Sequence, residues 1–127
     1  MPVRLFKSYK QGVADGEQKR DFIYVEDAVA VMCWMLQRPS VSGIFNVGTG
    51  RARSFNDLIG ALFHALGRSS YIQYIDMPPA IRAQYQYFTQ SSVENLRGAG
   101  YNVDFLSLEE GVGRYVTRFL GQADPYR

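Results

Sequence analysis

Three short segments rich in β-branched and aromatic residues constrain most what this chain can fold into. They span residues 22–25, 43–47 and 71–75, and each is expected to form a strand. Helical patterns separate them, which predicts a mixed α/β fold. Three short strands make a poor sheet for so many apolar helices, so residues 1–127 are expected to be a single domain that belongs to a larger fold.

Four helices are predicted. Residues 26–37 carry apolar side chains at helical spacing, behind Glu26 and Asp27, which suit the positive N-terminal end of a helix. Three more helices are expected to begin at serines that have an acidic residue three positions later, the pattern of a capping box: Ser54, Ser91 and Ser107. Residues 1–20 lack a steady period and are expected to form a loop, with a helical remnant near residues 5–9.

Composition excludes several classes of function. The net charge is +2 and no run of Lys or Arg exceeds two residues, which argues against nucleic-acid binding. We find no signal peptide and no apolar stretch long enough to span a bilayer, so a cytoplasmic protein is expected. Cys33 lies in an apolar run and is predicted to be a buried thiol. One His and one Cys cannot form a convincing metal site, so no metal is expected.

Two motifs resemble the extended short-chain dehydrogenase/reductases that act on nucleotide sugars. They are Arg-Asp-Phe-Ile-Tyr-Val-Glu-Asp-Ala-Val at 20–29 and Asn-Val-Gly-Thr-Gly at 46–50. The runs at 82–90 and 107–112 are similar to those of the ADP-L-glycero-D-manno-heptose 6-epimerase family, and the resemblance covers about residues 5–120. It implies nucleotide-sugar epimerisation in the synthesis of the lipopolysaccharide inner core. Family members bind NADP on an N-terminal Rossmann domain, which also carries their catalytic Ser/Thr, Tyr and Lys.

The chain departs from that family in one respect. It contains no Gly-x-x-Gly-x-x-Gly and no Tyr-x-x-x-Lys. We therefore expect no catalytic and no cofactor-binding residue here, and no activity from the chain alone. The resemblance implies the C-terminal substrate-binding lobe of an epimerase, built of short strands and about four helices, with the N-terminal NADP-binding half missing. An alternative is a stand-alone, non-catalytic module for nucleotide-sugar binding or oligomerisation, and exposed apolar surface predicts a homo-oligomer in either case.

The resemblance places Arg20 at the diphosphate of an ADP-sugar substrate. A guanidinium group can form two parallel hydrogen bonds to a diphosphate, which suits this role. The alternative is a surface ion pair with Asp21 or Glu17.

Five further residues are candidates for substrate binding. Tyr85 matches a family tyrosine that touches the substrate, and its ring could pack on the ribose. Arg82, about one helical turn away, could add a second cation. Phe6, Lys7 and Ser8 match a family segment that lines the substrate pocket. The alternatives are a half-buried aromatic for Tyr85 and a docked terminus for the segment around Phe6.

Overall fold

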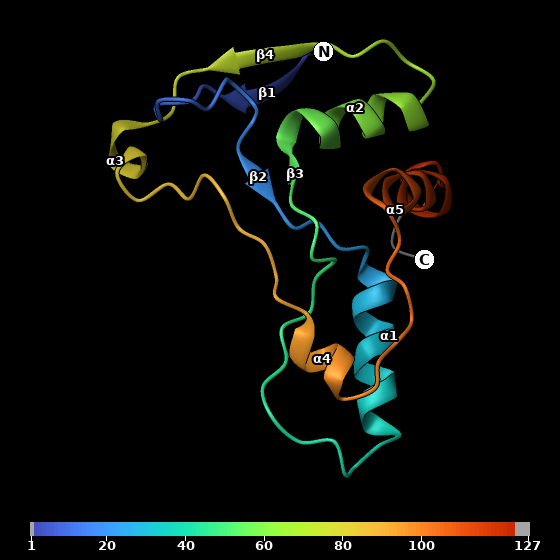
Figure 1. Ribbon diagram of the computed structural model, residues 1–127. Helices are drawn as coiled ribbons and strands as arrows, with labels where there is room; N and C mark the ends of the chain where they lie inside the picture. Colours follow the sequence, from blue (N-terminus) through green and yellow to red (C-terminus); the bar gives the residue numbers. More distant parts are fainter. Residues whose placement is uncertain (1, 124–127) are drawn as a thin grey trace.

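The computed structural model describes residues 2–123 and contains two small sheets flanked by helices (Figure 1). β1 (Val3–Phe6) pairs in parallel with β4 (Ile72–Ile75), and the first residues of the two strands lie opposite each other. β2 (Lys19–Arg20) pairs antiparallel with β3 (Arg53–Ser54). Each of these sheets has two strands. The predicted fold class, α/β with short strands, is confirmed.

The helices follow the predicted capping signals in two of three cases. Ser54 and Ser107 each accept a hydrogen bond from the backbone three residues later, and each forms a complete capping box. These boxes satisfy backbone groups that would otherwise lack partners at the first turn of a helix. The helical elements are α1 (Val25–Leu36), α2 (Phe55–Ala65), α3 (Pro79–Arg82), α4 (Glu94–Gly98), α5 (Leu108–Tyr115) and the π-helix η1 (Val116–Leu120).

The buried residues gather at two ends of the molecule. α2 packs against α5 and η1, beside the β1–β4 sheet at the top of Figure 1. α1 and α4 lie side by side at the other end, where Val31, Leu96 and Tyr101 form a buried cluster. β2 and β3 run between the two ends. They therefore connect the helices to the β1–β4 sheet, where the candidate site lies.

Two of the three predicted strands are absent from the described residues. Residues 22–24 and 43–47 have no strand structure, and Val25 already belongs to α1, although both predicted segments are rich in β-branched and aromatic side chains. The third prediction is confirmed, because 72–75 forms β4. The predicted loop is confirmed for residues 7–18. The helical remnant at 5–9 is wrong, because Val3–Phe6 is a strand paired with β4, and Lys19–Arg20 forms β2. A strand needs a partner, and local composition does not reveal which segments will meet.

Two smaller predictions are also wrong. Ser91 caps no helix: α4 begins after Val93 without a side-chain cap, and the backbone N–H of Ser91 donates to Asp21 instead. Cys33 is exposed rather than buried. The prediction of about four helices is close to the five α-helices found among residues 2–123. The additional helix, α3, is a single turn that begins at Pro79, whose fixed φ suits the start of a helix.

Candidate functional site

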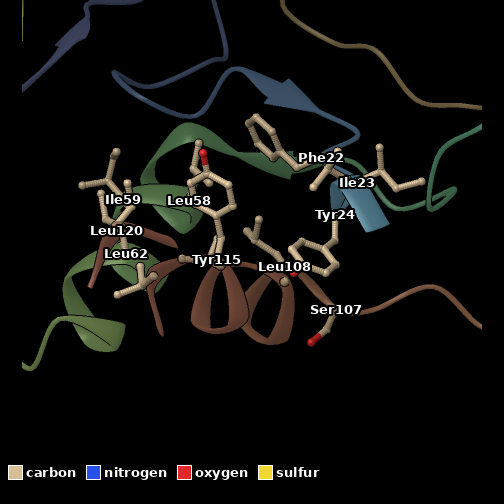
Figure 2. Close-up of a pocket in the computed structure, with 14 residues that line it drawn as sticks. Phe22, Ile23, Tyr24, Leu58, Ile59, Leu62, Ser107, Leu108, Tyr115 and Leu120 are labelled. Atoms are coloured by element: carbon tan, nitrogen blue, oxygen red, sulfur yellow. The ribbon is translucent and has the colours of Figure 1, made fainter. Parts of the chain in front are cut away.

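An apolar cavity of about 410 Å³ lies between α2, α5, η1 and the segment that precedes α1 (Figure 2). Leu58, Leu62 and Leu108 are among the side chains that surround it. None of its 14 lining residues carries a charge, and none is a predicted site residue. It therefore lacks the cations that a phosphate-bearing ligand requires.

A second cavity, of about 320 Å³, brings together residues that are far apart in the sequence. Phe6 and Tyr85, two of the predicted site residues, lie in its wall. The other lining residues come from β1, β4, the residue before β2 and the start of α2: Arg4, Leu5, Gln18, Phe55 and Ile75. Aromatic rings and a buried amide thus face one space, which suits a flat, partly polar ligand.

Arg20 stands beside this cavity, and its charge is unpaired within the described part of the chain. The guanidinium carbon lies 5.6 Å from the centre of the Tyr85 ring and 6.0 Å from that of Phe55. Its Nη1 donates to the carbonyl oxygen of Lys19 at 2.8 Å. Arg20 forms no ion pair with any carboxylate among residues 2–123, so the alternative of a surface ion pair is wrong.

The two acidic residues of that alternative are engaged elsewhere. The carboxylate of Glu17 accepts from the Asn56 amide at 2.6 Å. Asp21 accepts from the loop that precedes β3. The Arg20 guanidinium is therefore left to the aromatic rings and to any anion that enters the site.

Backbone hydrogen bonds hold Tyr85 next to Arg20. The N–H of Lys19 donates to the carbonyl oxygen of Tyr87 at 2.9 Å, and the N–H of Thr89 donates to the carbonyl oxygen of Lys19 at 3.2 Å. The Tyr85 and Tyr87 rings then meet edge to face, with centres 5.3 Å apart. The aromatic segment after α3 is thus fixed along β2.

Lys7 and Arg82 belong to a neighbouring cluster around Asp76. Lys7 Nζ and the hydroxyl of Tyr9 each lie 3.1 Å from Asp76 Oδ1. The hydrogen bond and the charge of Asp76 raise the pKa of Lys7, and the hydrogen bond from Lys7 is the largest cause of the lowered pKa of Asp76. Arg82 lies 3.9 Å above the Tyr9 ring and donates to the carbonyl oxygen of Met77. Neither cation lines the second cavity.

Ser8 is occupied by local contacts. Its N–H donates to Asp15 Oδ1 at 2.7 Å, and its hydroxyl lies 3.3 Å from the carbonyl oxygen of Lys10. Of the six predicted residues, the structure brings Phe6, Arg20 and Tyr85 together, and it places Lys7, Ser8 and Arg82 beside them rather than in the cavity.

Asp21, the residue next to Arg20, joins two distant backbone segments, residues 49–50 and Ser91. Its carboxylate accepts from the N–H groups of Thr49 at 2.8 Å, Gly50 at 2.9 Å and Ser91 at 3.0 Å. Burial by itself would raise the pKa of Asp21, but these hydrogen bonds and one from the Thr49 hydroxyl lower it below its ordinary value. Asp21 therefore helps to fix the position of Arg20, and its own carboxylate is occupied by these hydrogen bonds.

The same hydrogen bonds bear on whether this part of the chain could hold a dinucleotide. Such cofactors are held by free N–H groups of a glycine-rich turn that opens a helix. The turn at residues 48–50 precedes α2, but its N–H groups at Thr49 and Gly50 already donate to Asp21. The turn therefore does not fit a pyrophosphate.

Residues 2–123 show neither a cluster of metal ligands nor a membrane-spanning helix. In this part of the chain, no three His, Cys, Asp or Glu side chains lie close enough to hold a metal ion. No helix there combines the length and the apolar character needed to cross a membrane.

Gln18 and Phe55 are site residues that the sequence analysis missed. Both line the second cavity, and Gln18 is one of its most buried members. A signal for Gln18 was present, because it stands two residues before Arg20 and side chains two apart in extended backbone share a face. Phe55 directly follows the N-cap residue of α2, and no sequence feature indicated that it would line the cavity.

Comparisons with known proteins identify the relatives of this chain. Residues 3–48 match the sequence model of the NAD dependent epimerase/dehydratase family. Over 124 residues the chain is 53% identical to ADP-L-glycero-D-manno-heptose-6-epimerase of Nitratidesulfovibrio vulgaris strain DP4. That match covers 98% of this chain but only 38% of the relative. The chain thus spans about two fifths of the length of the curated relatives it matches.

Solved structures agree with this result. The Helicobacter pylori ADP-L-glycero-D-manno-heptose-6-epimerase superposes with a TM-score of 0.70 and 30% identity, over 91% of this chain and 32% of that one. A UDP-N-acetylglucosamine 4-epimerase from Methanobrevibacter ruminantium superposes with a TM-score of 0.75. At 22% identity, over 95% of this chain and 35% of that one, it supports the fold alone.

Proposed function

This chain is related to the ADP-L-glycero-D-manno-heptose-6-epimerases and corresponds to part of their length, and on that premise we propose that residues 1–127 form the substrate-binding domain of a nucleotide-sugar epimerase. The substrate is an ADP-heptose, and the product serves the lipopolysaccharide inner core. The NADP-binding domain and the catalytic residues belong to the part of the relatives that this chain does not cover, so the chain alone is inactive.

The observation that carries the proposal is the guanidinium of Arg20, which lies beside an aromatic-walled cavity and pairs with no carboxylate of residues 2–123. A diphosphate is an anion that a guanidinium binds with two parallel hydrogen bonds. The rings of Phe6 and Tyr85 offer flat surfaces for the base and the ribose. Lys7, Ser8 and Arg82 complete the proposed set as peripheral contacts.

An exposed apolar face supports the assignment to a larger assembly. Val25, Val29, Met32 and Leu36 recur at helical spacing along one side of α1, and all four are exposed, Leu36 by 83%. Ile44, in the segment that has strand-like composition without a partner, is 92% exposed. Contiguous exposed apolar surface of this kind marks an interface. We propose that this face contacts the part of the epimerase that this chain does not cover.

The same face favours a second candidate function, an oligomerising nucleotide-sugar-binding module. In that case a second copy of this chain covers the α1 face, and the protein binds an ADP-sugar without converting it. Both candidates require the Arg20 site, and they differ in the partner that covers α1.

Calorimetric titration with ADP-mannose tests the Arg20 site. The purified chain is expected to bind ADP-mannose, and Arg20→Ala is expected to weaken binding about tenfold or more, because a hydrogen bond to a charged group contributes about 1.5–3 kcal/mol. Arg51→Ala is the matched control, because it removes the same charge at an exposed position. Arg51 lies outside the cavity that Phe6 and Tyr85 line.

Three outcomes would contradict the proposal. Equal weakening by Arg20→Ala and Arg51→Ala would mean that only overall charge matters. Absence of binding to the wild-type chain would mean that it is not a substrate-binding domain by itself. Binding of NADP in a parallel titration would overturn the assignment of the cofactor to another part of the enzyme.

A further inference from the structure

Gln18 carries a buried amide oxygen without a hydrogen-bond partner in the described part of the chain. The residue is 1% exposed, and its amide nitrogen donates to the carbonyl oxygen of Phe6 at 3.3 Å. That bond decides which end of the amide faces Phe6 and leaves Oε1 at the other end. Leaving a buried acceptor unpaired is unfavourable, so an unpaired one calls for an explanation such as a ligand.

The backbone holds this amide in place. The carbonyl oxygen of Gln18 accepts from the N–H of Phe55 at 3.2 Å, and that of Gly16 accepts from the N–H of Asn56 at 3.0 Å. The first turn of α2 therefore clamps the chain on both sides of the Gln18 side chain. The position of Oε1 is therefore fixed, and a hydrogen-bond donor has to approach it from outside the described part of the chain.

Gln18 lines the same cavity as Phe6, Phe55 and Tyr85. Three aromatic side chains around a space of about 320 Å³ suit a flat ring. A flat ring that also carries an N–H group at its edge would satisfy the orphaned oxygen. The adenine ring of an ADP-sugar has such a group, the amino group at C6.

We propose that Gln18 is a specificity-determining residue whose Oε1 accepts a hydrogen bond from the adenine amino group of the bound substrate. This inference rests on the proposed function, which supplies the adenosine diphosphate. It adds a residue that recognises the adenine base, Gln18, two positions before Arg20, which binds the diphosphate.

The test compares two ligands that differ in one group. ADP and the diphosphate of purine riboside are identical except that the latter lacks the amino group. Calorimetry should show that the wild-type chain binds ADP about threefold to tenfold more tightly, the value of one neutral hydrogen bond. Gln18→Met keeps the length of the side chain without its polar atoms and should bind both ligands equally. Gln73→Met, at an exposed position of β4, is the control and should discriminate like the wild type.

The outcomes separate this inference from the proposed function. Equal binding of the two ligands by the wild type, with both weakened by Arg20→Ala, would leave the proposed function standing and overturn the role of Gln18. If Gln18→Met has the native circular dichroism spectrum and still binds ADP more tightly than the diphosphate of purine riboside, the amino group donates to another acceptor and the role of Gln18 is overturned. Absence of binding of either ligand to the wild type would overturn both. The wild-type comparison needs no variant, so it decides the matter even if Gln18→Met fails to fold.

Discussion

The guanidinium carbon of Arg20 lies 5.6 Å from the centre of the Tyr85 ring. The flanking residues set this spacing, because Lys19 exchanges backbone hydrogen bonds with Tyr87 and Thr89. A cation at this distance from an aromatic face is attracted to it. The ring therefore steadies the guanidinium while leaving its N–H groups available to an anion.

Replacing Tyr85 tests whether the ring or the hydroxyl contributes to binding. Tyr85→Ala removes the surface against which Arg20 lies, and we expect ADP-mannose to bind about threefold to tenfold more weakly, in line with about 0.5–1.5 kcal/mol for an aromatic contact. Tyr85→Phe keeps the ring and should stay within about twofold of the wild type. A loss in Tyr85→Phe as large as in Tyr85→Ala, measured by the same calorimetry, would transfer the role to the hydroxyl.

The stability of the chain should fall at acidic pH because of Asp21. The pKa of Asp21 is lowered in the folded chain from its ordinary value of 3.8. A group with a lowered folded-state pKa stabilises the fold above its unfolded-state pKa, and this stabilisation is lost as the pH falls through the folded-state value. Urea unfolding of the wild type should therefore show a falling midpoint below about pH 4.

Asp21→Asn isolates this contribution. The variant should be less stable by about 1–3 kcal/mol at pH 7, because an amide cannot accept from all three N–H groups. Its unfolding midpoint should also decline less steeply below pH 4, although Asp57 and Glu109, whose pKa values are also lowered, keep part of the slope. Asp104→Asn, at an exposed position, should leave both unchanged. Identical pH profiles for Asp21→Asn and the wild type would refute this explanation.

Gly48 should tolerate no side chain. A Cβ atom there would lie 2.5 Å from Cβ of Ser91 and 2.8 Å from Oδ2 of Asp21, so Gly48→Ala should destabilise the fold by about 1–3 kcal/mol through overpacking. Gly60→Ala is the matched control, because Gly60 lies inside α2 with no atom within 4 Å of the added Cβ. That variant should be more stable than the wild type by about 0.5–1 kcal/mol. Equal unfolding midpoints for the two variants would contradict the crowding at Gly48.

The exposed stripe on α1 should cause self-association of the isolated chain. Sedimentation velocity over a concentration series should show a dimer or a larger species, because apolar surface is removed from water on association. The double variant Val29→Glu/Met32→Glu should shift the chain to a monomer. Ala30→Glu, at an exposed position outside the stripe, should not. A wild-type chain that stays monomeric at every concentration would count against this interface.

The helices were predictable where their signals are local. The capping boxes at Ser54 and Ser107 each join groups three residues apart, so sequence spacing alone indicated them. Ser91 has the same spacing, yet its N–H donates to Asp21, a partner from a distant segment. The pattern there was the same, and a tertiary contact decided the outcome.

The strands were less predictable, because a strand is defined by its partner. Residues 72–75 form β4 only because 3–6 lie beside them, and the latter segment has no strong β pattern of its own. Residues 43–47 have that pattern and no partner among the described residues. Composition describes a segment's preference, whereas pairing depends on which segments the rest of the fold brings together.

For this protein, the sequence alone determined the α/β class, the position of the main helices and the motifs that relate it to nucleotide-sugar epimerases. All of these depend on residues that are neighbours in the chain. Only the tertiary structure decided that Phe6, Gln18, Arg20 and Tyr85 meet at one site and that, among residues 2–123, the Gln18 oxygen is left without a donor. The reason is that convergence and burial arise from long-range packing, which local spacing does not encode.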